Sequence, residues 1–224
     1  MTENDGLAAR RVIEDEARSA KRRLRILVEE RVLAMSPAER ESADAAIAER
    51  VIGHPEWIDA HAVLLYRSLP YEVGTDGLLE AALSAGKELY LPRITGDRMG
   101  FHRVADRSEL RRLSPHRFGM FEPPAHARRW ESPHPWRPAI VVCPGRVFDM
   151  RGGRIGHGGG FYDRFLAGAL PIDAPETQLT VAGICYETQL VEEVPTHSND
   201  HPIDIVFTEQ RIVLRRIEPD TGIV

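Results

Sequence analysis

The stretch Gly152-Gly-Arg-Ile-Gly-His-Gly-Gly-Gly160 holds six glycines in nine residues. The apolar run Ala139–Cys143 lies upstream of it, and a helix-like segment, residues 161–170, follows directly. A strand, a glycine loop and a helix in this order are typical of α/β proteins that present backbone N–H groups to phosphate. Glycine lets the main chain approach a ligand closely, and a helix start has N–H donors without partners. With Arg154 as a fixed cation, this segment predicts an anion site in an α/β fold.

The glycine loop lacks the spacing of the common nucleotide-binding motifs. It has neither the Gly-x-Gly-x-x-Gly pattern of a dinucleotide fold nor the Gly-Lys-Ser/Thr ending of a P-loop. The chain has no Gly-x-Ser-x-Gly nucleophile elbow, and we assign no zinc site to its nine histidines. A glycine-rich turn can be only a tight connection between two elements. The glycine density, Arg154 and the adjoining helix start together favour the anion site.

Strands and helices alternate along the rest of the chain. Ser36-Pro37 is typical of a helix start, with serine as N-cap and proline at the first helical position. Residues 114–138 are rich in proline, so little regular structure is expected there. The alternation predicts an α/β sandwich with some antiparallel edge strands. Helices are expected at 7–34, 37–52, 76–83 and 160–170, and strands at 62–66, 88–94, 99–104, 139–143, 180–186, 203–208 and 211–215.

Size and composition indicate one globular domain. The chain has 224 residues, 42% of them hydrophobic, and no apolar run long enough to span a membrane. A net charge of −5 argues against bulk nucleic-acid binding. The polar, acidic start does not suit a secretion signal, and Cys143 and Cys185 are expected as buried, reduced thiols. We therefore expect a cytoplasmic protein that acts on small molecules and contacts neither nucleic acid nor membrane.

Acidic and basic residues near the expected anion site have two interpretations each. Asp163 falls in the first turn of the helix after the loop, where an acid can simply complement the helix dipole. Beside phosphate, however, several carboxylates make sense if Mg²⁺ joins them, and Asp149 and Asp200 lie on expected loops. Asp149 can instead brace its turn. Lys21 and Arg25 share one helix face, which composition alone assigns to solvent.

From about Lys21 to Glu209 the chain resembles the 5-formyltetrahydrofolate cyclo-ligase family, also called 5,10-methenyltetrahydrofolate synthetase. The most specific segment is Pro144-Gly-Arg-Val-Phe-Asp-Met-Arg-Gly-Gly-Arg-Ile-Gly-His-Gly-Gly-Gly-Phe-Tyr-Asp-Arg164. It is similar to the family pattern Pro-Gly-x-x-Phe-Asp, then x-Gly-x-Arg-Leu-Gly-x-Gly-x-Gly-Tyr-Tyr-Asp. Shorter matches include residues 21–25, 69–75, 91–93, 118–123 and 194–200.

The resemblance implies a single domain over residues 1–224, with residues 1–20 as a helical extension. It also implies a three-layer, Rossmann-like (NagB/RpiA-like) α/β fold with a mostly parallel central sheet and antiparallel edge strands. The implied activity is the ATP- and Mg²⁺-dependent cyclisation of 5-formyltetrahydrofolate to 5,10-methenyltetrahydrofolate through a phosphorylated formyl group, with release of ADP and phosphate. We expect a monomer or a weak homodimer.

Site residues follow from the resemblance by position. The implied catalytic residues are Arg154 and Lys21. The implied ATP-binding residues are Lys21, Arg25, Arg154, Ile155, Gly156, His157, Gly158, Gly159, Gly160, Phe161 and Tyr162. The implied folate-binding residues are Arg67, Glu72, Phe118, His157, Gly158, Gly159, Gly160, Phe161 and Tyr162. The implied Mg²⁺ ligands are Asp163 and Asp200.

Three positions depart from the family pattern. Phe161 replaces a common tyrosine, His157 a common arginine or tyrosine, and Arg67 an aliphatic or small residue. These departures leave open a divergent paralogue that binds folate or another anion without turnover. A sugar-phosphate isomerase-like enzyme, which also uses an anion loop on an α/β sheet, is a further alternative.

Overall fold

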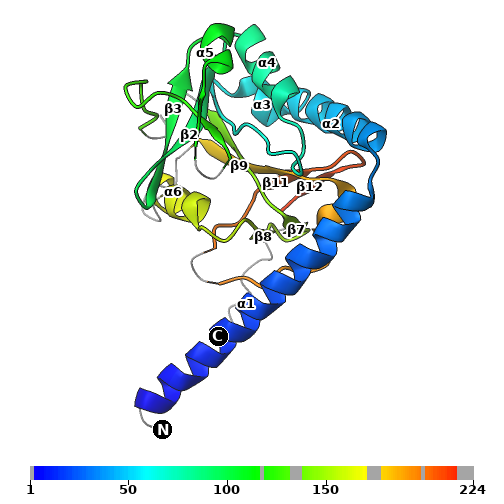
Figure 1. The fold of residues 1–224 in the computed structure, drawn as a ribbon, viewed down its shortest axis with the longest axis vertical. Coiled ribbons are helices and arrows are strands. Elements are labelled where there is room, and N and C mark those ends of the chain that lie inside the picture. The colour runs from blue at the N-terminus through cyan, green and yellow to red at the C-terminus, as the bar shows by residue number, and fades with distance from the viewer. Residues whose placement is uncertain (1–2, 117–118, 132–137, 171–177, 198–199, 216–224) are drawn as a thin grey trace, which may run out of the picture.

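The computed structural model describes residues 3–116, 119–131, 138–170, 178–197 and 200–215, with side chains from residue 16 onward. Its centre is a seven-stranded sheet in the order β12-β11-β9-β6-β1-β2-β3 (Figure 1). The strands from β11 to β2 run parallel, whereas β12 and β3 are antiparallel edges. The strands are β1 Ala62–Leu64, β2 Glu88–Thr95, β3 Arg98–Val104, β6 Ala139–Cys143, β9 Leu179–Ile184, β11 Ile205–Phe207 and β12 Ile212–Leu214.

Helices cover both faces of this sheet, which confirms the three-layer prediction (Figure 1). Alternate side chains of β6 face opposite layers: Ile140 belongs to the core cluster beneath α1, α2 and α4, and Val141 to the cluster beneath α6. This is the period expected of a strand buried on both faces. The helices are α1 Glu3–Ala34, α2 Pro37–Ile52, α3 Pro55–Asp59, α4 Asp76–Ser84, α5 Arg107–Arg111 and α6 Phe161–Ala169, with a 3₁₀ turn η1 Glu187–Gln189.

The start of α2 confirms the expected helix signal. Ser36 Oγ accepts a hydrogen bond from the Glu39 N–H at 3.2 Å, and a Glu39 carboxylate oxygen accepts one from the Ser36 N–H at 2.7 Å. Pro37 stands at the first helical position. This reciprocal capping box satisfies two N–H groups that a helix start leaves without partners.

The connection between β6 and α6 differs from the prediction. We expected one glycine loop between strand and helix, but the antiparallel pair β7 Val147–Asp149 and β8 Arg154–Ile155 lies between them. The proline-rich segment also contains a short antiparallel pair, β4 Ser114–Pro115 and β5 Phe121–Glu122. A further strand, β10 Leu190–Val191, pairs with β7. All these strands are too short for a periodic signal in the sequence.

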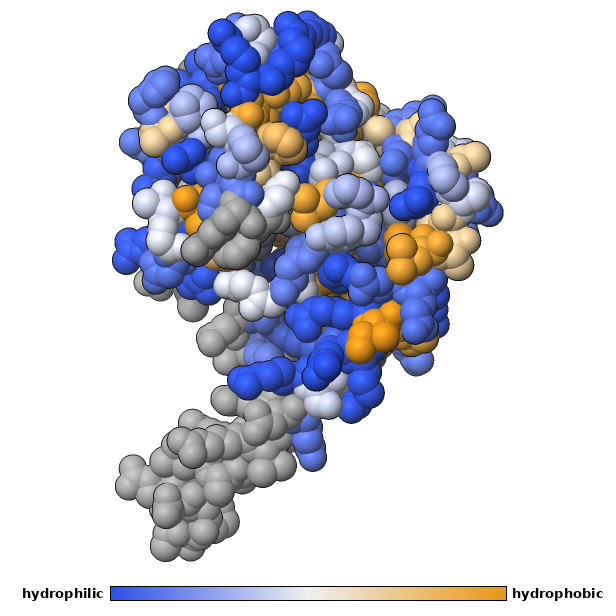
Figure 2. Space-filling view, in the orientation of Figure 1, coloured by the Kyte–Doolittle hydropathy of each residue, from blue (hydrophilic) through white to orange (hydrophobic). Residues whose placement is uncertain are grey.

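The surface mixes exposed polar residues with several exposed apolar side chains. Hydrophilic residues dominate the face in Figure 2, with apolar residues in small groups. On α1, Ile26 and Leu33 are exposed whereas Val28 and Val32 are buried. No helix among the described residues is both long and apolar enough to cross a membrane. Both cysteines are buried thiols, as predicted.

Candidate active site

A cavity of about 950 Å³ opens where the order of the parallel strands reverses. From β1 the chain continues to β2 on one side, and from β6 it continues to β9 on the other. Ligands of open α/β sheets bind outside the carboxyl ends of the strands at such a switch point. Tyr66 and Arg67, just after β1, and Pro144, just after β6, all line the cavity.

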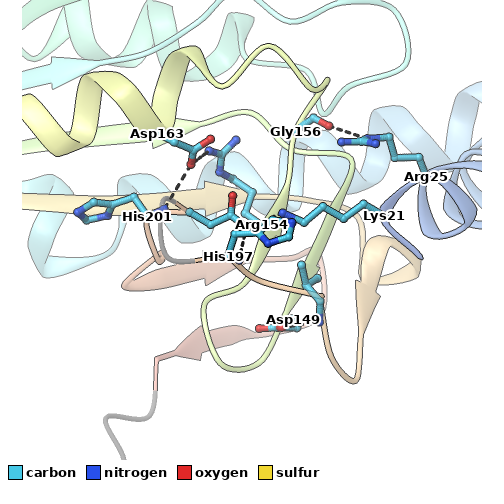
Figure 3. Close-up of polar contacts among 10 residues, drawn as sticks. Lys21, Arg25, Asp149, Arg154, Gly156, Asp163, His197 and His201 are labelled. Carbon is cyan, nitrogen blue, oxygen red and sulfur yellow. Dashed lines mark hydrogen bonds and ion pairs between the residues drawn. The ribbon is translucent and has the colours of Figure 1, made fainter. Parts of the chain in front are cut away.

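One end of the cavity is polar and holds two ion pairs. Lys21 Nζ lies 2.5 Å from Asp200 Oδ2. An Arg154 terminal nitrogen lies 2.8 Å from Asp163 Oδ1, and Figure 3 shows these two side chains facing each other. Lys21 comes from α1, so the helix at the start of the chain forms part of the wall. The alternative that Lys21 belongs to a solvated surface is wrong, because its side chain is only 13% exposed.

Arg154 is held rigidly at the base of this polar end. Its side chain is 5% exposed, and its other terminal nitrogen donates to the Pro144 carbonyl at 3.1 Å. Its guanidinium carbon lies 5.8 Å from the centre of the Tyr162 ring. Within the described residues, Arg154 Nε is buried without a hydrogen-bond partner. Such an orphaned donor beside a cavity suits a ligand acceptor.

Arg25 approaches the glycine loop from α1. Its Nε donates to the Gly156 carbonyl at 2.9 Å (Figure 3). Burial, and then the nearby positive charge of Arg146, lower the pKa of the Arg25 guanidinium. Arginine keeps its proton despite such a shift, so an anion bound here would relieve repulsion between two cations.

The glycine loop exposes backbone donors where it enters α6. Gly158 has φ 101° and Gly160 has φ 64°, a region that favours glycine. A Cβ on Gly160 would also lie 2.8 Å from a terminal nitrogen of Arg164. Among the described residues, no partner accepts from the N–H groups of Gly158, Gly159 or Gly160. The loop therefore has the free donors predicted for an anion site.

Another part of the cavity lining, here called the apolar end, consists mostly of apolar side chains. Leu69, Met99 and Phe121 line it, and Arg67 covers the Phe121 ring with its guanidinium carbon 5.0 Å from the ring centre. The further apolar lining residues are Tyr71, Pro92, Ile94 and Met120. This end offers a surface for a flat, largely apolar group.

Glu72 and His157, which both line the cavity, contact each other. A Glu72 carboxylate oxygen lies 2.8 Å from His157 Nε2, and the other oxygen accepts from the Leu69 N–H at 2.8 Å. The Tyr71 ring packs edge-on against His157. The Glu72–His157 contact therefore joins the loop after β1 to the glycine loop.

Tyr162 places a buried hydroxyl at the cavity. Within the described residues this hydroxyl has no hydrogen-bond partner. Burial, and to a smaller extent neighbouring groups that include Cys143 and Glu72, raise the pKa of Tyr162 well above its ordinary value. The group therefore keeps its proton and can donate to a ligand.

Asp149 does not face the cavity, and the alternative that it braces its turn is confirmed. One of its oxygens accepts from the Arg151 and Gly153 N–H groups at 2.8 and 2.7 Å. The other accepts from the Val194 N–H at 2.8 Å. Asp149 thus fixes the hairpin that carries Arg154, and Figure 3 shows it apart from the ion pairs.

The donor set of the polar end fits Mg²⁺. Hydrogen bonds from described residues reach only Oδ1 of Asp163 and Oδ2 of Asp200, which leaves one oxygen of each carboxylate for another ligand. Mg²⁺ commonly takes one or two carboxylates with substrate phosphates and water. His197 and His201 flank Asp200, yet the described residues contain no group of three or more His, Cys, Asp or Glu side chains suited to a metal.

The cavity gathers nearly every residue that the sequence proposed for the site. Lys21, Arg25, Arg67, Glu72, residues 154–162, Asp163 and Asp200 all line it. Phe118 lies outside the described residues. The sequence analysis assigned no role to further lining residues, because they are single side chains that come together only in the fold. The main ones are Arg18, Tyr66, Leu69, Tyr71, Met99, Phe121 and His197.

Comparisons with known proteins point to one family. The model of the "5-formyltetrahydrofolate cyclo-ligase family" matches residues 17–209. A "probable 5-formyltetrahydrofolate cyclo-ligase" of Schizosaccharomyces pombe is 29% identical over 181 residues, 77% of this chain and 87% of the relative. The 5-formyltetrahydrofolate cyclo-ligase of Escherichia coli K12 is 27% identical over 186 residues, which cover 83% of this chain and 98% of the relative. The solved structure of the 5,10-methenyltetrahydrofolate synthetase of Aquifex aeolicus matches with a TM-score of 0.72 and 27% identity. The match covers 91% of this chain and 99% of that protein.

Proposed function

Because the chain belongs to the 5-formyltetrahydrofolate cyclo-ligase family, we propose that it cyclises 5-formyltetrahydrofolate to 5,10-methenyltetrahydrofolate at the expense of ATP, with Mg²⁺ as cofactor. The observation that carries the proposal is a cavity whose lining combines basic side chains and the glycine loop with a set of apolar side chains. Two chemically different ligands can meet in such a cavity. Its volume of about 950 Å³ is at the upper end of the range for small-molecule sites.

ATP binds at the polar end in this proposal. Lys21, Arg25 and Arg154 neutralise phosphate charge, and the loop from Ile155 to Tyr162 donates backbone hydrogen bonds. The unpartnered N–H groups of the loop and Arg154 Nε support this assignment. Asp163 and Asp200 would hold the metal, which would offset part of the phosphate charge.

Folate binds at the apolar end. Glu72 accepts from N–H groups of the pterin, and Arg67 and residues 157–162 contact the rest of the substrate. Phe121, stacked beneath Arg67, is a further aromatic wall. Because Glu72 and His157 contact each other and both line the cavity, the substrate would lie against both loops.

The reaction has two steps. The formyl oxygen first attacks the γ-phosphorus of ATP, and the bond between that phosphorus and the ADP oxygen breaks. N10 then attacks the formyl carbon and loses its proton, and the carbon–oxygen bond breaks as phosphate leaves. Lys21 and Arg154 serve as catalytic residues by neutralising the transferring phosphoryl group, so the chain needs no covalent nucleophile.

We further infer a cytoplasmic enzyme that acts as a monomer or weak homodimer. Two buried thiols without a disulfide support a reducing compartment.

The direct test is spectroscopic. Purified protein mixed with 5-formyltetrahydrofolate, Mg²⁺ and ATP should develop the absorbance of the methenyl product. Omitting ATP or adding a chelator should abolish it. The proposal fails if the protein binds both ligands and no product forms.

Binding without turnover is the second candidate, and the His157–Glu72 contact favours it. This contact occupies one of the carboxylate oxygens that the pterin would use. Calorimetry that detects folate binding with no ATP consumption would establish this candidate. A sugar-phosphate isomerase-like enzyme would need no nucleotide, so micromolar ATP affinity would count against it.

A further inference from the structure

At the polar end, cations and carboxylates are already joined in pairs. Lys21 pairs with Asp200 at 2.5 Å, and Arg154 pairs with Asp163 at 2.8 Å. All four side chains are at most 24% exposed. Each pair joins a cation assigned to phosphate with a carboxylate assigned to the metal. In the absence of ligands, both members of each pair therefore already have a partner of opposite charge.

We propose that these two pairs make the polar end selective for metal-bound ATP over metal-free ATP, by an exchange of ion-pair partners. This inference rests on the proposed function. When both phosphate and metal enter, each cation passes from its carboxylate to phosphate and each carboxylate passes to the metal. The charges remain paired throughout. Asp163 and Asp200 thus disfavour the binding of metal-free nucleotide in addition to binding the metal.

Metal-free ATP would bind this site less favourably than metal-bound ATP. Its phosphates would lie beside Asp163 and Asp200, and like charges a few ångströms apart repel in a partly buried site. Taking Lys21 or Arg154 for phosphate also leaves a carboxylate unpaired, which is costly where solvent access is limited. Free metal would also bind unfavourably, because it would displace a cation from each carboxylate and leave that cation unpaired.

The geometry supports an exchange of partners and not a purely structural role for the two ion pairs. Asp163 Oδ2 and Asp200 Oδ1 accept no hydrogen bond from the described residues, so each carboxylate can begin to bind metal before it releases its cation. Asp200 Oδ2 also accepts from the His197 N–H at 2.9 Å, and this bond can hold the carboxylate in place after Lys21 leaves.

The test measures ATP affinity by calorimetry, with excess Mg²⁺ and with excess chelator. Wild-type protein should bind ATP at least about tenfold more tightly with Mg²⁺. Asp200→Asn keeps a hydrogen-bond acceptor for Lys21 but removes the charge. It should bind metal-free ATP about tenfold more tightly than wild type does, and should lose most of the gain from Mg²⁺. Asp163→Asn should behave in the same way.

The control is Asp97→Asn, because Asp97 is exposed and does not line the cavity. It makes the same change in net charge and should leave both affinities unchanged. Thermal melts confirm folding, and Asp200→Asn alone decides the question if Asp163→Asn does not fold. Aspartate variants that bind metal-free ATP no better than wild type overturn the inference and leave the proposed function standing. A wild-type protein that does not bind ATP with Mg²⁺ overturns both.

Discussion

At the scale of single residues, Arg154 connects the loop to the proposed chemistry. The sequence identified it as the cation inside the glycine loop, and in the structure it is buried at the base of the cavity. Its bonds to Asp163 and Pro144 fix the guanidinium without using Nε. The sequence could not predict the pair with Asp163, because that contact depends on how β8 and α6 meet.

Replacing Arg154 by alanine should lower kcat/KM by roughly 10²-fold or more, a loss of about 3 kcal/mol, because a fixed cation at the transferring phosphoryl group disappears. Steady-state formation of the methenyl product measures this. Arg154→Lys should recover part of the rate, since it retains the charge but not the geometry. A near-normal rate in Arg154→Ala would show that the residue is only structural.

Replacing Glu72 by glutamine should raise KM for 5-formyltetrahydrofolate about tenfold and leave ATP affinity unchanged. The amide oxygen can still accept from the Leu69 N–H, so the loop keeps its brace. What is lost is a charged acceptor for the pterin, worth about 1.5–3 kcal/mol in general. Kinetics with each substrate varied in turn check the result, and an unchanged KM for folate would remove Glu72 from the folate site.

At the scale of elements, periodic segments were predictable and short ones were not. The four expected helices correspond to α1, α2, α4 and α6, and the seven expected strands are those of the central sheet. Each has an apolar period or a run of β-branched residues. The strands β7 and β8 have neither signal, because they are defined by their pairing with each other and by hydrogen bonds to the buried Asp149 carboxylate. For the same reason the sequence predicted only the glycine loop, residues 152–160, between the strand at 139–143 and the following helix.

Two glycine-to-alanine changes should have opposite effects on stability. A Cβ on Gly183 in β9 would lie 2.5 Å from the buried Phe148 ring, so Gly183→Ala should lower the free energy of unfolding by about 1–3 kcal/mol. A Cβ on Gly168 in α6 would contact nothing within 4 Å, so Gly168→Ala should raise it by up to about 1 kcal/mol. Denaturant titrations measure both. Equal effects of the two changes would contradict this packing.

At the scale of the whole molecule, the site joins distant parts of the chain. Lys21 on α1 meets Asp200, 179 positions further along the sequence. The sequence placed Lys21 at the site only through the family resemblance, and it offered Asp200 before that only as an acid on an expected loop. Neither residue belongs to a local motif that indicates their contact. The apolar end was predicted least well, because Tyr71, Met99 and Phe121 come together only through the order of the strands.

The buried thiols predict how stability depends on pH. Burial raises the pKa of Cys143 from an ordinary value of 9.0 to about 12. Its contribution to stability is therefore complete below about pH 9 and declines as the pH rises toward 12, since the unfolded thiol loses its proton first. The free energy of unfolding, measured from about pH 8 to about pH 11, should decrease, and less steeply in Cys143→Ala. Identical slopes in the two proteins would contradict the assignment.

The most direct test of the whole account follows one oxygen atom. 5-Formyltetrahydrofolate labelled with heavy oxygen in the formyl group is turned over with Mg²⁺ and ATP, and the released phosphate is analysed by mass spectrometry. Transfer of the γ-phosphoryl group to the formyl oxygen predicts that the label appears in inorganic phosphate, one atom for each methenyl product formed. Methenyl product formed together with unlabelled phosphate would contradict the account.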